Sequence, residues 1–141
     1  MQIKLEGVFT WPGSERRSDR YGVVTLDDKN YEDTAAAKVV ADVKALRLMA
    51  GHRVKVVAHV VEARESGHIG DFVRGLSPIT PIVGEEHGLG EGVLFLEELV
   101  WSPMGVGLGL LPDDGRETDW FDPRVLYRLH DQTVLLIVED V

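Results

Sequence analysis

The sequence contains no cysteine among its 141 residues, so a disulfide, a thiolate metal site and a thiol nucleophile are all excluded. It also lacks a long apolar run. The stretch from Val134 to Val138 is far too short to cross a bilayer. Residues 1–6 alternate polar and apolar side chains, unlike the apolar block of a signal peptide. These absences predict a cytoplasmic protein with no membrane partner.

Basic residues are scarce in one half of the chain only. The whole sequence has 15 Lys and Arg against 24 Asp and Glu, a formal net charge of −9. Residues 1–74 carry 12 basic against 11 acidic side chains, whereas residues 75–141 carry 3 against 13. The acidic total disfavours a general nucleic-acid binder, because such binding neutralises phosphates. The second half is either a set of solvated acidic loops or an acidic face for a basic partner.

The remaining composition is that of a globular protein. The hydrophobic share of 44% and the charged share of 28% are close to globular averages. A chain of this length buries enough surface to fold as one unit. No linker or internal repeat interrupts it. We therefore expect a single β-rich domain over residues 1–141.

Alternating polar and apolar residues predict many short strands. The clearest runs from His52 to Ala63, with an aliphatic face and a mixed face. Further strands are expected at residues 3–9, 21–26, 72–74, 93–101, 105–111 and 133–139, the first two of these forming a hairpin. The glycine-rich stretch from Gly84 to Gly92 predicts a loop or a tight hairpin.

Two segments have helical periodicity. The main helix is expected at residues 33–50, where an apolar stripe includes Val43 and Leu46 and Gly51 follows as a C′ residue. A short helix is expected at 123–129, after Asp122 as N-cap and Pro123 in the first turn. Together these elements predict a mostly β (α+β) fold, a single small antiparallel barrel or curled sheet with one main helix.

Few motifs point to chemistry. The glycine clusters at 88–92 and 105–109 lack the helix and the Lys-Ser/Thr pair of a phosphate loop, so turns and strand bulges are the better interpretation. Ser66, His68 and Asp71 lie too close together in one turn for the usual geometry of a triad. The five histidines show no metal-ligand spacing, and the group Glu85 to His87 supplies one ligand at most. The sequence therefore predicts no catalytic residue, no metal and no cofactor.

The leading hypothesis is a non-enzymatic binding module whose acidic C-terminal half docks on a basic protein. Large aromatic residues surrounded by acidic ones are typical of docking hot spots, and Trp120 and Phe121 lie between Asp119 and Asp122. The alternative is that Trp120 and Phe121 pin the short helix to the core. The candidate partner-binding residues are Asp113, Asp114, Glu117, Asp119, Trp120 and Phe121.

An alternative is a small β-barrel that binds an anionic ligand or single-stranded nucleic acid. Basic and aromatic residues together can hold a nucleic-acid strand by charge and stacking. The candidate anion-binding residues are Arg16, Arg17, Arg20, Arg53, Lys55, Arg64, His68 and Arg74. A second alternative is a small hydrolase-like enzyme that uses His68.

Overall fold

The structure is a computed structural model that describes residues 1–11, 23–27, 43–63, 81–100, 102, 104–111 and 123–141. The strands are β1 (Gln2–Thr10), β2 (Thr25–Asp27), β3 (Arg53–Glu62), β4 (Glu86–Glu98), β5 (Val106–Leu111) and β6 (Thr133–Asp140). Helix α2 spans Pro123–Leu129, and residues 43–49 are also helical. The six strands form one antiparallel sheet in the order β2-β1-β6-β3-β4-β5.

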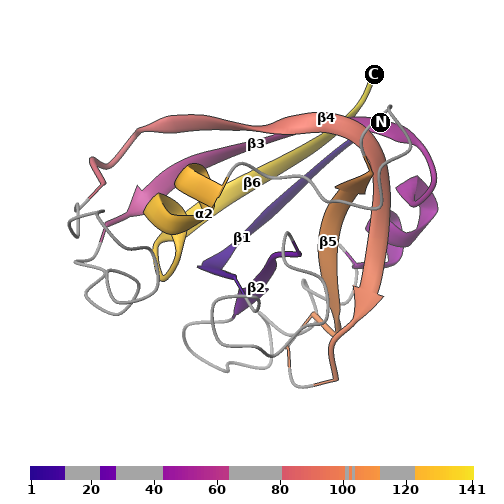
Figure 1. Cartoon of the computed structure of the whole chain (residues 1–141), viewed down its shortest axis with the longest axis horizontal. Helices are drawn as coiled ribbons and strands as arrows, with labels where there is room; N and C mark the ends of the chain where they lie inside the picture. Colours follow the sequence, from indigo (N-terminus) through magenta and orange to yellow (C-terminus); the bar gives the residue numbers. More distant parts are fainter. Residues whose placement is uncertain (12–22, 28–42, 64–80, 101, 103, 112–122) are drawn as a thin grey trace.

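Two strands change partner along their length, which makes the sheet curl. The first half of β4 pairs with β3 and its second half with β5, and Val93 pairs on both sides. Strand β1 does the same at Val8, between β6 and β2. In Figure 1, β4 accordingly bends through a wide arc around the molecule. The result is a half-barrel wrapped around the core.

The two edge strands of the curled sheet meet at one point. An antiparallel bridge joins Val24, just before β2, to Leu108 in β5. The Val24 amide donates to the Leu108 carbonyl at 2.9 Å, and the Leu108 amide donates back to the Val24 carbonyl at 2.7 Å. These bonds satisfy backbone groups that an open sheet edge would leave unpaired.

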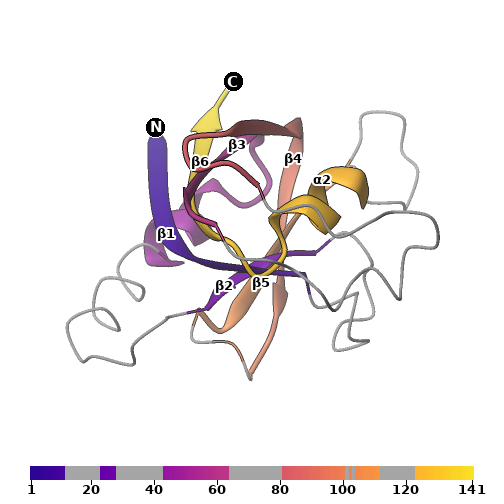
Figure 2. The same cartoon turned by 90° about the vertical axis from the view of Figure 1, so that its left-hand side faces the viewer.

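The core lies on the concave face of the sheet. Alternate residues of each strand point inward, and Val54, Val56 and Ala58 of β3 are fully buried. Helix α2 and residues 43–49 lie on opposite sides of the half-barrel (Figures 1 and 2). Each adds buried side chains to the same hydrophobic cluster, including Leu46 and Leu126. This burial stabilises each helix more than its own propensity does.

The expected fold class is confirmed, and most described elements agree with the sequence. The short helix has the predicted bounds, and residues 43–49 confirm the end of the main helix. Gly51 follows that helix at a φ of +85°, the left-handed conformation that favours glycine at C′. Strands β1, β3, β5 and β6 match predicted strands, and the β1–β2 hairpin is present. The expected strand at 72–74 and the start of the main helix lie outside the described residues.

The loop or tight hairpin predicted from Gly84 to Gly92 is wrong, because β4 already begins at Glu86. Of the two uses predicted for the glycine cluster at 88–92, turns and strand bulges, the structure shows a bulge. Val56 pairs with Gly90 and Val57 with Gly88, so Leu89 is the extra residue on the β4 side. Bulges bend and twist a strand, and glycine density there resembles the density of a turn. The same strand ends at Glu98, three residues earlier than expected.

Candidate functional site

The convex side of the sheet, which we call the outer face, carries several charged residues around a hollow. It consists of the outward-pointing residues of β1, β6, β3 and β4, which lie next to one another in three rows across the strands. From β1 to β4 the rows are Gln2, Glu139, Lys55 and Glu91; Lys4, Ile137, Val57 and Gly88; and Glu6, Leu135, His59 and Glu86.

The middle of the outer face is apolar. Leu135, Ile137 and Val57 are only half-buried there, although they lie on neighbouring central strands. At the end of the middle row, Gly88 has no side chain, and a Cβ built on it would meet no atom within 4 Å. The carboxylates of Glu86 and Glu139 lie in the rows on either side. The outer face therefore combines an aliphatic floor with an acidic border.

A hollow of about 210 Å³ lies in this face. Its lining residues come from β1, β3, β4 and β6, and they are Gln2, Lys55, Val57, His59, Glu86, Ile137 and Glu139. Two carboxylates and one ammonium group give the lining one net negative charge when the imidazole is neutral. The sequence did not single out Glu139 or Ile137, and it named Glu86 only within a group that could supply one metal ligand, because only strand pairing places the three residues together.

Two members of the predicted anion-binding set lie on the outer face. Arg53 and Lys55 are alternate residues of β3, so both side chains point to solvent on the same side. The Arg53 Nε is 3.2 Å from Oε1 of Glu91 in an exposed ion pair. Lys55 sits between Glu139 and Glu91 in its row. Each cationic group therefore has acidic neighbours, which weakens the attraction of this pair for an anion.

The other predicted site residues lie outside the described residues. This holds for all of the candidate partner-binding set, namely Asp113, Asp114, Glu117, Asp119, Trp120 and Phe121. It also holds for the rest of the candidate anion-binding set, namely Arg16, Arg17, Arg20, Arg64, His68 and Arg74. The roles assigned to them stay predictions.

A second polar cluster joins α2 to the turn that precedes β4. The Arg128 guanidinium donates to both carboxylate oxygens of Glu85, with Nε 2.7 Å from Oε2. The His87 Nε2 lies 2.8 Å from the same Oε2, and the Ile82 amide donates to Oε1 at 2.9 Å. The Glu85 side chain is 18% exposed and that of Arg128 is 26% exposed. The cluster is thus partly shielded from water.

The hydrogen bonds from Arg128, more than those from His87 and the Ile82 amide, hold the pKa of Glu85 far below its ordinary value. The same contact raises the pKa of Arg128 above its ordinary value. An ion pair that is bidentate and partly shielded contributes more than an exposed one. The cluster therefore acts as a clamp that fixes the end of α2 against the sheet.

The sequence predicts that the group Glu85 to His87 supplies one metal ligand at most. In the structure, the Glu85 carboxylate already binds a guanidinium, and its two oxygens are engaged by Arg128, His87 and a backbone amide. Within the described ranges, no three Asp, Glu or His side chains gather in a way that could hold a metal ion. The cluster is explained by its role in packing α2.

Other buried polar groups also connect distant segments. The Thr25 and Ser102 hydroxyls are 2.7 Å apart, which ties β2 to the turn after β4. The Trp11 amide donates to Nδ1 of His130 at 3.0 Å, so this buried imidazole carries its proton on Nε2 when neutral.

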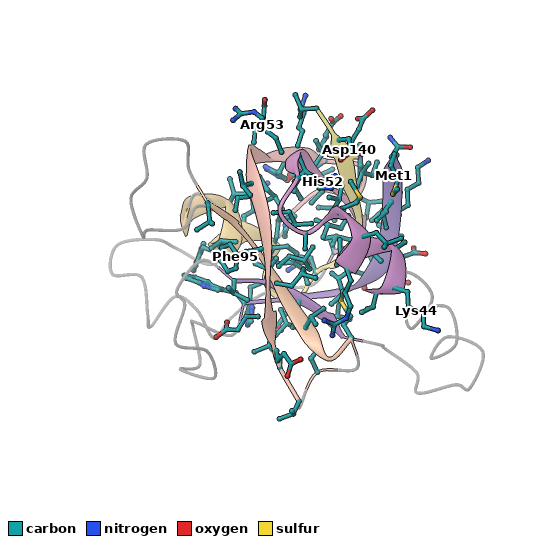
Figure 3. All side chains as sticks on the ribbon, turned by 90° about the vertical axis from the view of Figure 1, so that its right-hand side faces the viewer. Met1, Lys44, His52, Arg53, Phe95 and Asp140 are labelled. Atoms are coloured by element: carbon teal, nitrogen blue, oxygen red, sulfur yellow. The ribbon has the colours of Figure 1, made fainter. Side chains whose placement is uncertain are left out.

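At one rim, Asp140 lies near His52 and Met1, well away from Phe95 (Figure 3). None of these residues lines the hollow in the outer face.

Comparison with known proteins gives no further assignment. No protein-family model, curated protein or solved structure matches this chain. Among the described residues, no helix has the length and apolar character needed to span a bilayer. The function is therefore inferred from the outer face and from the sequence.

Proposed function

We propose that this protein is a non-enzymatic binding module that docks on a basic protein surface. The observation that carries the proposal is the arrangement of the outer face, where acidic residues border a half-buried aliphatic floor. Glu86 and Glu139 are both exposed and lie on opposite sides of the row that contains Ile137 and Val57. Docking surfaces commonly combine an apolar centre with a charged rim.

The charge of the chain supports the same class of partner. The formal net charge is −9, and residues 75–141 alone carry 13 acidic against 3 basic side chains. Carboxylates spread over a surface steer a basic partner into contact and raise the association rate, mainly at low salt. The acidic segment with Asp113, Asp114 and Glu117 is a second candidate surface for the same partner.

A basic peptide tests this function directly. Binding of fluorescently labelled decalysine is measured by anisotropy at about 10 mM and about 150 mM salt, between which the Debye length falls from about 30 to about 8 Å. We expect measurable binding at low salt and a loss of at least about tenfold in affinity at the higher salt. Absence of binding at low salt would contradict the proposal.

Charge reversal locates the surface. Glu139→Lys changes a carboxylate that lines the hollow, and we expect about fivefold weaker decalysine binding because one attraction becomes a repulsion of about 1 kcal/mol. Glu98→Lys is the matched control, because Glu98 is an exposed carboxylate of β4 outside the hollow. Equal effects of the two variants would show a general charge effect with no role for the outer face.

Reversal of the acidic segment completes the test. A triple variant with Lys at positions 113, 114 and 117 removes three carboxylates from the segment that the sequence predicts to bind partners. We expect an additional loss of binding in this variant. If it alone abolished binding while Glu139→Lys had no effect, the docking function would stand and the part assigned to the outer face would be wrong.

A further inference from the structure

We infer that the hollow in the outer face binds one lysine or arginine side chain of the basic partner, an inference that rests on the proposed docking function. The hollow lies where the aliphatic floor and the acidic border meet. Its lining contains Ile137 and Val57 as the floor, with Glu139 and Glu86 on two different strands. The size of the hollow, the chemistry of its lining and its open approach favour this ligand.

The size of the hollow fits one side chain. Its volume is about 210 Å³. An apolar cavity of about 150 Å³ already holds a group as large as benzene, whereas sites for drug-sized ligands and cofactors start at about 300 Å³. The hollow therefore has room for a single long side chain.

The chemistry of the lining matches a side chain with an apolar stem and a cationic head. Lysine and arginine bury their methylene groups on apolar surfaces while the charged end stays near water or a carboxylate. Here Ile137 and Val57 would contact the stem, and Glu139 or Glu86 would pair with the head. A purely apolar side chain would desolvate the carboxylates without compensation, which is unfavourable.

The approach to the hollow is open on the β4 side. Gly88 neighbours Val57 in the middle row of the outer face, and the space above it contains no atom within Cβ contact distance. A glycine inside a strand often marks a place where another backbone approaches closely. The partner chain can therefore lie low over β4 while one of its side chains enters the hollow.

Neither an anion nor a metal ion fits the lining as well. The two carboxylates would repel an anion, and Lys55 is the one permanently cationic group among the lining residues. The described residues contain no group of three potential ligands that could hold a metal ion. The remaining net charge favours a cation with a single positive charge.

Short peptides that differ in one side chain test the inference. The probes are capped pentapeptides of glycine and serine with lysine, arginine or norleucine at the centre, because norleucine keeps an apolar stem without the charge. Binding is followed by NMR titration of the full chain. For lysine and arginine we expect a Kd of about 1 mM, which corresponds to about −4 kcal/mol. The shifted amides should be those of the lining residues, and norleucine should bind at least about tenfold more weakly.

Two variants separate shape from charge. Val57→Phe enlarges an outward-pointing side chain of the floor and fills the hollow, whereas the double variant Glu86→Gln and Glu139→Gln keeps its shape and removes its charge. Each should weaken binding of the lysine pentapeptide at least about fivefold. Glu98→Gln, outside the hollow, should leave binding unchanged. Circular dichroism of every variant confirms folding, and the glutamine variant keeps the test decisive if Val57→Phe unfolds.

Decalysine distinguishes failure of this inference from failure of the proposed function. If decalysine binds the wild-type chain but neither Val57→Phe nor the glutamine variant alters binding of the pentapeptides or decalysine, the docking function stands and the hollow is not the subsite. Equal affinity for norleucine and lysine would also overturn the inference. If decalysine itself fails to bind at low salt, the proposed function is wrong, and any pentapeptide binding would need another explanation.

Discussion

At the scale of single residues, glycine is required where two strands bring a side chain against the backbone. Phe95 of β4 pairs with Gly109 of β5, and the Phe95 ring lies across the glycine. A Cβ built on Gly109 would be 2.2 Å from Cζ of Phe95, so no larger residue fits without movement. The sequence predicted only that the glycine cluster at residues 105–109 lies within a strand. The Phe95 ring explains why Gly109 is needed.

Gly109→Ala should therefore destabilise the protein by about 2 kcal/mol, the typical cost of overpacking. Gly88→Ala is the matched control, because the position is also in a strand but its Cβ would meet no atom within 4 Å. We expect that control to change the free energy of unfolding by less than about 0.5 kcal/mol. Urea denaturation measures both. Equal destabilisation would mean that backbone flexibility, and not the Phe95 ring, explains the requirement.

At the scale of elements, two devices position the parts of the half-barrel. The bulge at Leu89 and the change of partner at Val93 let one long strand serve both halves of the sheet. The clamp between Glu85 and Arg128 fixes α2 beside the start of that strand. The sequence predicted the bounds of α2 correctly from its capping residues and stripe. It did not predict this pairing, because 43 positions separate the two residues.

The clamp should make the free energy of unfolding depend on pH. Because the folded state lowers the pKa of Glu85, the clamp contributes fully above the ordinary carboxyl pKa of about 4.3. Below that value the contribution falls progressively, because the unfolded state takes up a proton that the folded state does not, and it is fully lost only when the folded-state carboxylate is also protonated. At pH 7, we expect Glu85→Gln to lower the free energy of unfolding by about 2 kcal/mol. The difference from wild type should shrink toward pH 2.

Chemical denaturation of both proteins across this pH range measures the effect. Glu98→Gln serves as the control, because Glu98 is an exposed carboxylate at the end of β4. That control should differ little from wild type at any pH. A constant difference between wild type and Glu85→Gln at all pH values would show that the clamp acts through shape alone.

At the scale of the whole molecule, the curled sheet is joined at its edges and presents its acidic residues outward. The bridge between Val24 and Leu108 connects β2 to β5, which occupy opposite ends of the strand order. The buried contact of Thr25 with Ser102 supports the same junction. This junction pairs the two sheet edges at one point, and the outer face is the broad surface that we propose for docking.

The bridge that joins the two sheet edges should be visible in native-state hydrogen exchange. The amides of Val24 and Leu108 both donate across the bridge, so they should exchange at least about tenfold more slowly than the amide of the exposed Val100. The amide of Leu136, in the central strand β6, provides the protected reference. If Val24 and Leu108 exchange as fast as Val100, the edges open readily and the sheet is not joined in solution.

The sequence by itself determined the fold class, the short helix, the end of the main helix and the faces of β1 and β3. These follow from local periodicity and capping, which act over neighbouring residues. It also determined the overall acidity that favours a basic partner. Only the tertiary structure decided between a turn and a bulge for glycines 88 and 90, paired Glu85 with Arg128, and placed Glu86 across the hollow from Glu139. Each of these depends on strand register and on long-range pairing, which local patterns do not encode.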